Sequence, residues 1–134
     1  MILDTQYLGA LADGDEAARE KARALDESAI PVRIPTAVVW EVYTGIGNAP
    51  PEGQGAELRA LYERLIASRP TVDLTPAVAR RAGELNGTHT KSDVVKGLDG
   101  ADSVVAAHGL LLDEAVVSND SDFQAVDGLE VETY

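Results

Sequence analysis

The feature that most constrains the fold of this sequence is an alternation of short apolar runs with longer helix-like segments. The segments expected to be strands cover residues 1–3, 32–34, 71–74, 115–117 and 129–133. Two parallel strands need a connection of a dozen or more residues, which is usually a helix. The alternation therefore predicts an α/β fold with a mostly parallel central sheet of about four or five strands, flanked by helices on both faces.

The segments between these runs have helical spacing and helix-start or helix-stop residues. Pro35 suits the first turn of a helix, Thr36 can help to cap it, and Gly45, Gly47 and Asn48 are expected to end it. A polar stretch at 86–93 is expected to end or interrupt the helix before it. The predicted helices span residues 7–11, 15–26, 35 to about 48, 52 or 55 to 68, 76 to about 86, 99–108 and 121–126.

The 134 residues form one predicted domain, 1–134, because no Pro/Gly/Ser-rich linker divides them. Cysteine is absent, so disulfides and thiolate metal sites are excluded, and a metal must be held by oxygen or histidine nitrogen. The N-terminus has no secretory pattern, and no apolar run reaches the roughly 20 residues needed to cross a bilayer. We expect a soluble, cytoplasmic protein that does not bind membranes.

The formal net charge is −12, whereas nucleic-acid-binding modules usually carry a basic stripe. Such a charge counts against a simple nucleic-acid-binding module. Two explanations remain, and both can hold: some carboxylates are metal ligands, or the surface is acidic because the source is a halophilic archaeon or another salty cell. High salt would also screen the repulsion between this surface and RNA.

Several acidic residues fall where strands end and helices begin. Asp4 follows the first apolar run, Asp120 follows a later one, and Asp102 lies in the first turn of the helix between them. Ligands bind at the carboxyl edge of open α/β sheets. Glu41, in a mostly apolar helix, faces the same edge if that helix packs across the first strand.

A cluster of carboxylates without a cation would be costly, because like charges force some of them to take up protons. Hard divalent ions such as Mg²⁺ and Mn²⁺ prefer oxygen ligands and keep several waters. The acids therefore predict a bound metal, whose usual chemistry is to activate water for displacement at phosphorus.

Four stretches in this order, MILDT at the start, PTAVVWEVYTGI around Glu41, ADSVVAA around Asp102 and VSNDSDF at 117–123, resemble PIN domains, in particular the VapC-type toxin ribonucleases. The resemblance covers essentially the whole chain. It implies a PIN-like α/β/α sandwich and a metal-dependent endoribonuclease that cuts RNA as the toxin of a type II toxin–antitoxin system. It also implies a homodimer, held inactive by a small antitoxin that inserts a segment into the acidic cleft.

Carried over by position, the resemblance makes Asp4, Glu41 and Asp102 catalytic metal ligands, with Thr5 hydrogen-bonding nearby. Family members place a fourth acid at the position of Asn119 or at that of Asp122. Because this chain has Asn at the former, the fourth ligand is expected to be Asp122.

Further polar residues lie close to these positions in the sequence. Asp120 is the alternative fourth acid, Asp99 could join the site or cap its helix, and Ser118 could orient a ligand or a water.

The acids other than Glu41 also have a purely structural explanation, whereas Glu41, among apolar neighbours, needs a partner or a cation. Asp4, Asp102 and the Asp120/Asp122 pair could be helix caps or helix-start acids. His108 and His89 are not assigned to catalysis, and Trp40, Tyr43 and Tyr62 are expected in the core or in dimer contacts rather than on bases.

Three other functions compete with a toxin nuclease. A non-toxin PIN nuclease for RNA processing would share the same residues. A Mg²⁺-binding receiver-like domain is disfavoured because no second acid stands beside Asp4 and no Lys lies beyond Lys96. A non-catalytic binding domain that keeps the fold is the third possibility.

Overall fold

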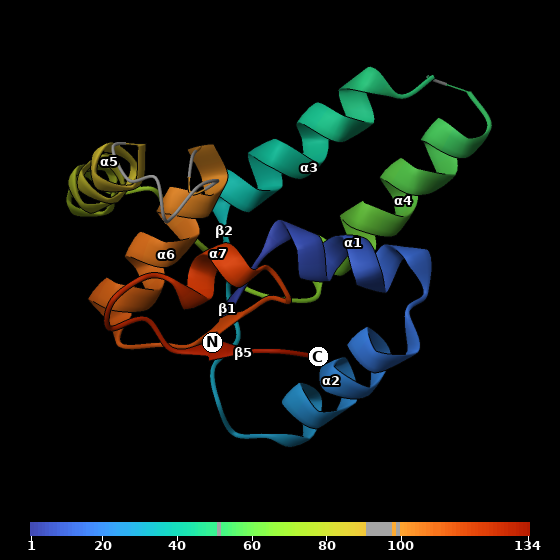
Figure 1. Ribbon diagram of the computed structural model, residues 1–134. Coiled ribbons are helices and arrows are strands. Elements are labelled where there is room, and N and C mark those ends of the chain that lie inside the picture. Colours follow the sequence, from blue (N-terminus) through green and yellow to red (C-terminus); the bar gives the residue numbers. More distant parts are fainter. Residues whose placement is uncertain (51, 91–97, 99) are drawn as a thin grey trace.

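The protein is described by a computed structural model that covers residues 1–134 except 51, 91–97 and 99 (Figure 1). Its strands are short, and each overlaps a predicted strand. They are β1 (Ile2–Leu3), β2 (Ile34–Pro35), β3 (Thr71–Val72), β4 (Val116–Val117) and β5 (Val131–Glu132).

All strand pairings among the described residues are parallel. β1, β4 and β5 form one sheet in that order, and β2 pairs with β3 in a second sheet. A parallel bridge between Ile2 and Arg33 joins the two sheets, and the Leu3 N–H donates to the Arg33 carbonyl at 2.9 Å. The strands thus lie side by side in the order β3-β2-β1-β4-β5, which confirms the predicted parallel α/β fold.

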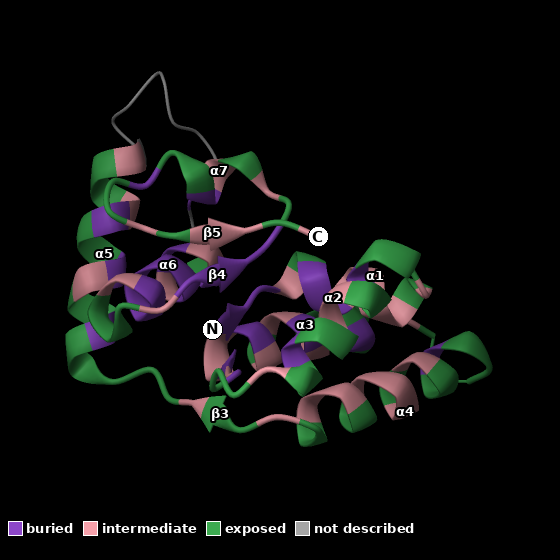
Figure 2. Ribbon diagram, turned by 90° about the horizontal axis from the view of Figure 1, so that it is seen from below, coloured by how far each residue is buried: buried purple, intermediate pink, exposed green. Residues whose placement is uncertain are grey.

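Helices cover both faces of this sheet, as Figures 1 and 2 show. α6 contacts β1, β2 and β4 on one face, and α5 packs outside it. α1, α3 and α4 form a contacting group on the other side, with α2 beside α1. The helices are α1 (Thr5–Asp13), α2 (Glu16–Glu27), α3 (Thr36–Asn48), α4 (Gln54–Ala67), α5 (Pro76–Thr90), α6 (Gly100–Leu112) and α7 (Ser121–Gln124).

α6 is the most buried helix, and its small residues are the reason it can lie so close to the sheet. Ala106 and Ala107 are fully buried, and Gly109 sits directly against β4. A Cβ atom at Gly109 would lie 3.0 Å from the Glu114 carbonyl oxygen and 3.1 Å from the Val116 side chain. The small-residue stretch therefore sets the distance between the helix and the strand that leads to the acidic turn after β4.

α3 ends at Asn48, the last of the three residues expected to end it, and Gly45 and Gly47 lie inside the helix because Val42 and Ile46 hold it on the core. An exposed helical glycine costs only about 1 kcal/mol, which such packing offsets. Thr36 does not cap α3, since its hydroxyl accepts a hydrogen bond from the Leu74 N–H at 3.2 Å.

The helices α5 and α6 are longer than predicted. α5 continues into the polar stretch and reaches Thr90, and α6 runs to Leu112 rather than to His108. Residues 91–93, which complete the predicted helix stop, lie outside the described residues.

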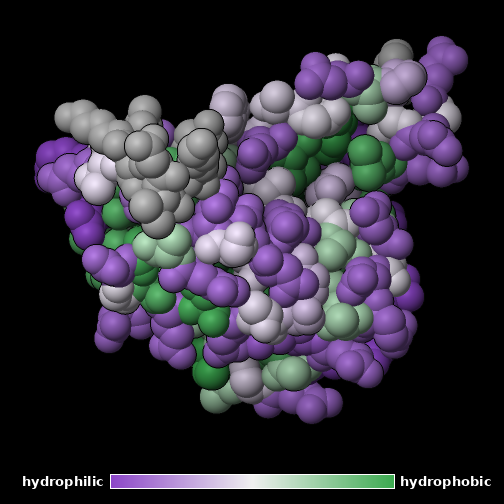
Figure 3. All heavy atoms as spheres, viewed as in Figure 1, coloured by the Kyte–Doolittle hydropathy of each residue, from purple (hydrophilic) through white to green (hydrophobic). Residues whose placement is uncertain are grey.

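The surface is mostly hydrophilic on the face shown in Figure 3, with apolar residues in the hollow between α3 and α4. The large apolar side chains exposed elsewhere include Trp40, at 66 %, and Leu74, at 49 %. Trp40 is therefore not a core residue. None of the described helices combines the length and the apolar character that crossing a bilayer would require.

Candidate active site

Asp4 stands at the junction of β1 and α1, and its carboxylate is almost completely buried, at 2 % exposure. It is the N-cap of α1, with Oδ1 accepting the Thr5 backbone N–H at 2.6 Å. Oδ2 accepts the Ser118 hydroxyl at 2.8 Å. The capping role considered for Asp4 is thus real. With the Gln6 backbone N–H as a third donor, the two oxygens together still have capacity for another ligand.

The surroundings of Asp4 disfavour its ionised form. Burial raises the pKa of Asp4 from 3.8 to about 6, although the Ser118 hydroxyl and the backbone N–H groups of Thr5 and Gln6 oppose the shift. The charge of Glu41 raises the pKa of Asp4 further. A positive ion beside Asp4 would reverse the balance, because it favours the ionised form.

Glu41 reaches the same place from α3. Its Oε2 accepts a hydrogen bond from the Thr5 hydroxyl, and its side chain is half-buried. Thr5 therefore connects the two acids, with its N–H on Asp4 and its hydroxyl on Glu41. Thr5 was expected to hydrogen-bond near the acids, and in the structure its two donors contact one acid each.

The turn after β4 closes the other side of Asp4. The Ser118 hydroxyl, fully buried, donates to Asp4 and accepts the Asp120 backbone N–H at 3.0 Å. Gln6, from the first turn of α1, accepts the Asn119 backbone N–H with its side-chain Oε1 at 3.0 Å. The sequence analysis missed Gln6, which only the pairing of β1 with β4 brings to this turn.

Asp102 and Asp122 occupy the first turns of α6 and α7, and both are half-buried. The first turn of α6 lies against the first turns of α3, since Ala101 and Val104 line one apolar pocket with Ala37 and Trp40. Asp102 is thus near the helix that carries Glu41. Asp99 lies outside the described residues.

Asp120 and Asn119 have local roles in the structure. Asp120 is the N-cap of α7, and its Oδ1 accepts the Asp122 backbone N–H at 2.9 Å. The Asn119 side chain holds the backbone of Tyr134, since its Oδ1 accepts the Tyr134 N–H and its Nδ2 donates to the Tyr134 carbonyl, each at 3.0 Å. The amide of Asn119 is therefore engaged by β5 and its extension rather than turned toward Asp4.

The donor set suits a small oxygen-seeking cation, although the acids do not form one closed cluster. No group of three acids or histidines in the described part of the chain is close enough to enclose a metal. The two acids that Thr5 links, Asp4 and Glu41, still meet the usual requirement of Mg²⁺, which takes one or two carboxylates and keeps several waters. Asp102 and Asp122 are not part of a group of three acids within the described residues.

Comparison with known proteins places the chain in a family. The family model of the PIN domain matches residues 1–129. Among solved structures, VapBC2 from Rickettsia felis bound to a DNA fragment from its promoter has a TM-score of 0.82 at 15 % identity, covering 98 % of this chain and 96 % of that chain. The DNA-bound VapBC from Salmonella typhimurium has a TM-score of 0.79 at 19 % identity, with coverage of 98 % and 96 %.

A toxin–antitoxin complex from Klebsiella pneumoniae has a TM-score of 0.70 at 18 % identity, with coverage of 98 % and 95 %. A search of curated proteins gives no match. At these identities the solved structures establish the fold alone, whereas the family model matches almost the whole sequence. With Asp4 and Glu41 at the carboxyl edge of a parallel sheet, the chain belongs to the PIN domain family.

Proposed function

We propose that this protein is a metal-dependent endoribonuclease and the toxin of a toxin–antitoxin pair. The observation that carries the proposal is the buried Asp4 carboxylate, which Thr5 links to Glu41 at the carboxyl edge of a PIN-family sheet. A buried acid next to a second acid is stable only with a proton or a cation beside it. Of these two, a bound cation is the one that can activate a water for cleavage of a phosphodiester.

The metal in this proposal is Mg²⁺ or Mn²⁺, held by Asp4 and Glu41, with Asp102 and Asp122 as the further oxygen donors. When bound, such an ion supplies an activated water and stabilises charge at phosphorus. The protein's own contribution is orientation. Thr5 and Ser118 each fix one carboxylate oxygen of Asp4, so the carboxylate is held in one orientation.

The proposal includes two protein partners, a cognate antitoxin and a second copy of this chain. A hollow between α1, α2 and α4, lined by Leu8, Leu11, Leu25 and Leu65, could receive the apolar face of a helical antitoxin segment. Exposed Trp40, with Leu74 on the same pocket, offers the apolar contact that homodimer interfaces use.

The test is an RNA cleavage assay with purified protein, Mn²⁺ or Mg²⁺, and both low and high salt. We expect cleavage that stops on addition of EDTA and is lost in Glu41→Gln and Asp102→Asn. Glu27→Gln, at the exposed end of α2, is the control for removing one acid. Full activity of Asp102→Asn, with EDTA still inhibiting, would remove Asp102 from the site.

A growth experiment separates a toxin from an RNA-processing nuclease of the same family. A toxin arrests growth when expressed alone, and co-expression of a small neighbouring reading frame relieves the arrest. A processing nuclease would cleave RNA in the assay without arresting growth. The receiver-like alternative is not supported, because the PIN family model accounts for residues 1–129.

A further inference from the structure

The side chain of Gln6 is held in one orientation at the edge of the acidic site. Its Oε1 accepts the Asn119 backbone N–H at 3.0 Å, and the Ser118 hydroxyl lies 3.3 Å from the same oxygen. A backbone N–H can only donate, so the amide oxygen must face the Ser118–Asn119 turn. The NH₂ group of Gln6 must therefore face away from that turn.

The two N–H bonds of this NH₂ group have no acceptor among the described residues, and Gln6 is exposed. The group is nevertheless close to the buried acid. The Gln6 backbone N–H lowers the pKa of Asp4 by hydrogen bonding, and the Ser118 hydroxyl contacts both side chains. An oriented donor with no partner in the protein thus stands beside Asp4.

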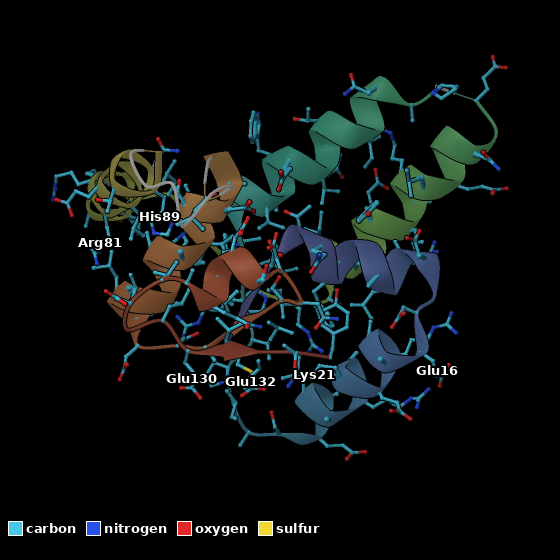
Figure 4. All side chains as sticks on the ribbon, in the orientation of Figure 1. Glu16, Lys21, Arg81, His89, Glu130 and Glu132 are labelled. Carbon is cyan, nitrogen blue, oxygen red and sulfur yellow. The ribbon has the colours of Figure 1, made fainter. Side chains whose placement is uncertain are left out.

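The charge distribution makes such a neutral donor useful. The ion pairs among the described residues include none of Asp4, Glu41, Asp120 and Asp122. Figure 4 labels the members of one of these pairs, Lys21 and Glu132, below β5 and beside α2. A phosphodiester strand that approaches these acids needs donors that point at it, and an amide donates without disturbing a metal site as a cation would.

We propose that Gln6 contacts the RNA backbone, with its side-chain NH₂ donating to a non-bridging phosphate oxygen of the strand bound beside Asp4. The inference rests on the proposed nuclease function and names a residue that positions the substrate. The competing role is a structural one, in which Gln6 only holds the turn through Asn119. The two roles use opposite ends of the same amide, so substitutions can separate them.

Three variants of Gln6 form the test. Gln6→Glu keeps an oxygen for the Asn119 N–H but loses the donors, Gln6→Lys keeps a donor but loses the oxygen, and Gln6→Met loses both without changing charge. Gln54→Glu and Gln54→Lys, at the exposed start of α4, are matched controls for total charge. For each variant kcat, KM and the melting temperature are measured with a short single-stranded RNA and Mn²⁺.

We expect Gln6→Glu and Gln6→Met to raise KM about tenfold, the loss associated with one hydrogen bond to a charged group, with kcat little changed. Gln6→Lys should keep KM at or below that of the unmodified protein, even if its melting temperature falls with that of Gln6→Met. KM values that follow the melting temperature instead, normal in Gln6→Glu and raised in Gln6→Lys, would overturn the inference. If the unmodified protein neither binds nor cleaves RNA, the proposed function itself falls, and this inference with it.

Discussion

The Ser118 hydroxyl donates a hydrogen bond to Oδ2 of Asp4 at 2.8 Å, although the two residues are 114 positions apart in the sequence. Both side chains are buried, and both lie immediately after paired strands, β1 and β4. The contact is thus a direct consequence of that strand pairing, and it holds the most buried acid of the site in place.

Ser118→Ala should weaken both the fold and the site. The change leaves Oδ2 of Asp4 and the Asp120 N–H without their partner, so we expect a loss of about 1–3 kcal/mol in the free energy of unfolding. Denaturant titration measures this loss, and the Mn²⁺ concentration for half-maximal activity should rise. Ser28→Ala, which removes a hydroxyl at the end of α2, is the control, and an equal Mn²⁺ effect there would refute the role of Ser118.

Asp4→Asn should stabilise the metal-free protein while it abolishes cleavage. The raised pKa of Asp4, about 6, means that the folded state disfavours the ionised carboxylate at pH 7. The neutral amide of similar size removes this penalty, which is of the order of 2 kcal/mol. Thermal melts in EDTA at pH 7 provide the measurement. A lower melting temperature for Asp4→Asn than for the unmodified protein would show that the carboxylate is not destabilising.

Gly109→Ala and Gly83→Ala should change stability in opposite directions. A Cβ at Gly109 meets the Glu114 carbonyl at 3.0 Å and the Val116 side chain at 3.1 Å, so we expect a loss of about 1–3 kcal/mol. At Gly83, in α5, nothing lies within 4 Å of the added Cβ, and alanine should add about 0.5–1 kcal/mol. Parallel urea titrations decide the point, and stabilisation of both variants would contradict the close approach of α6 to β4.

His108 should make the protein less stable in mild acid. Burial lowers the pKa of His108 below 6.5, against the opposing charge of Glu114, and its buried Nε2 has no hydrogen-bond partner among the described residues. The histidine therefore takes up a proton near pH 6.5 in the unfolded chain but only at lower pH in the folded chain. The free energy of unfolding falls as the pH drops below 6.5. Replacing His108 with Leu should flatten this dependence between about pH 7 and 5, measured by urea titration in EDTA.

The same substitution at His89, in α5, controls for the loss of a histidine as such. An unchanged pH profile for His108→Leu would show that another group causes the acid sensitivity. The raised pKa of Asp4 has the opposite effect on stability, because Asp4 takes up a proton near pH 6 in the folded protein but only at lower pH in the unfolded chain. This contribution is the same in the His108 and His89 variants and cancels when their pH profiles are compared.

Trp40→Glu should convert the proposed homodimer into a monomer. Trp40 is 66 % exposed, and a charge at the centre of an apolar contact costs several times more than one at its rim. Sedimentation equilibrium gives the mass, and circular dichroism verifies that the fold is kept. Leu111→Glu, in the last turn of α6 and 50 % exposed, is the matched variant. A dimer that Leu111→Glu dissociates and Trp40→Glu leaves intact would place the interface elsewhere.

The parts of the site that could be predicted are those that depend on local sequence. The run at residues 1–3 becomes a buried strand because its side chains are apolar, and the following Asp4 begins the next helix because its oxygen accepts a backbone N–H. The same reasoning placed Asp102 in the first turn of α6, and Asp120 and Asp122 at the start of α7. Helix ends were predicted less well, since the packing of Val42 and Ile46 overrode the glycines in α3.

Sequence alone thus determined the alternation of strands and helices, the parallel sheet and the position of each acid at the start or inside of a helix. Tertiary structure decided which of these residues meet. Because β1 pairs with β4, Ser118 and Gln6 close around Asp4, and because β5 extends past the same turn, Asn119 holds Tyr134 instead of facing the site. The reason is that local spacing sets the conformation of a segment, whereas contacts across 114 positions depend on strand order and register.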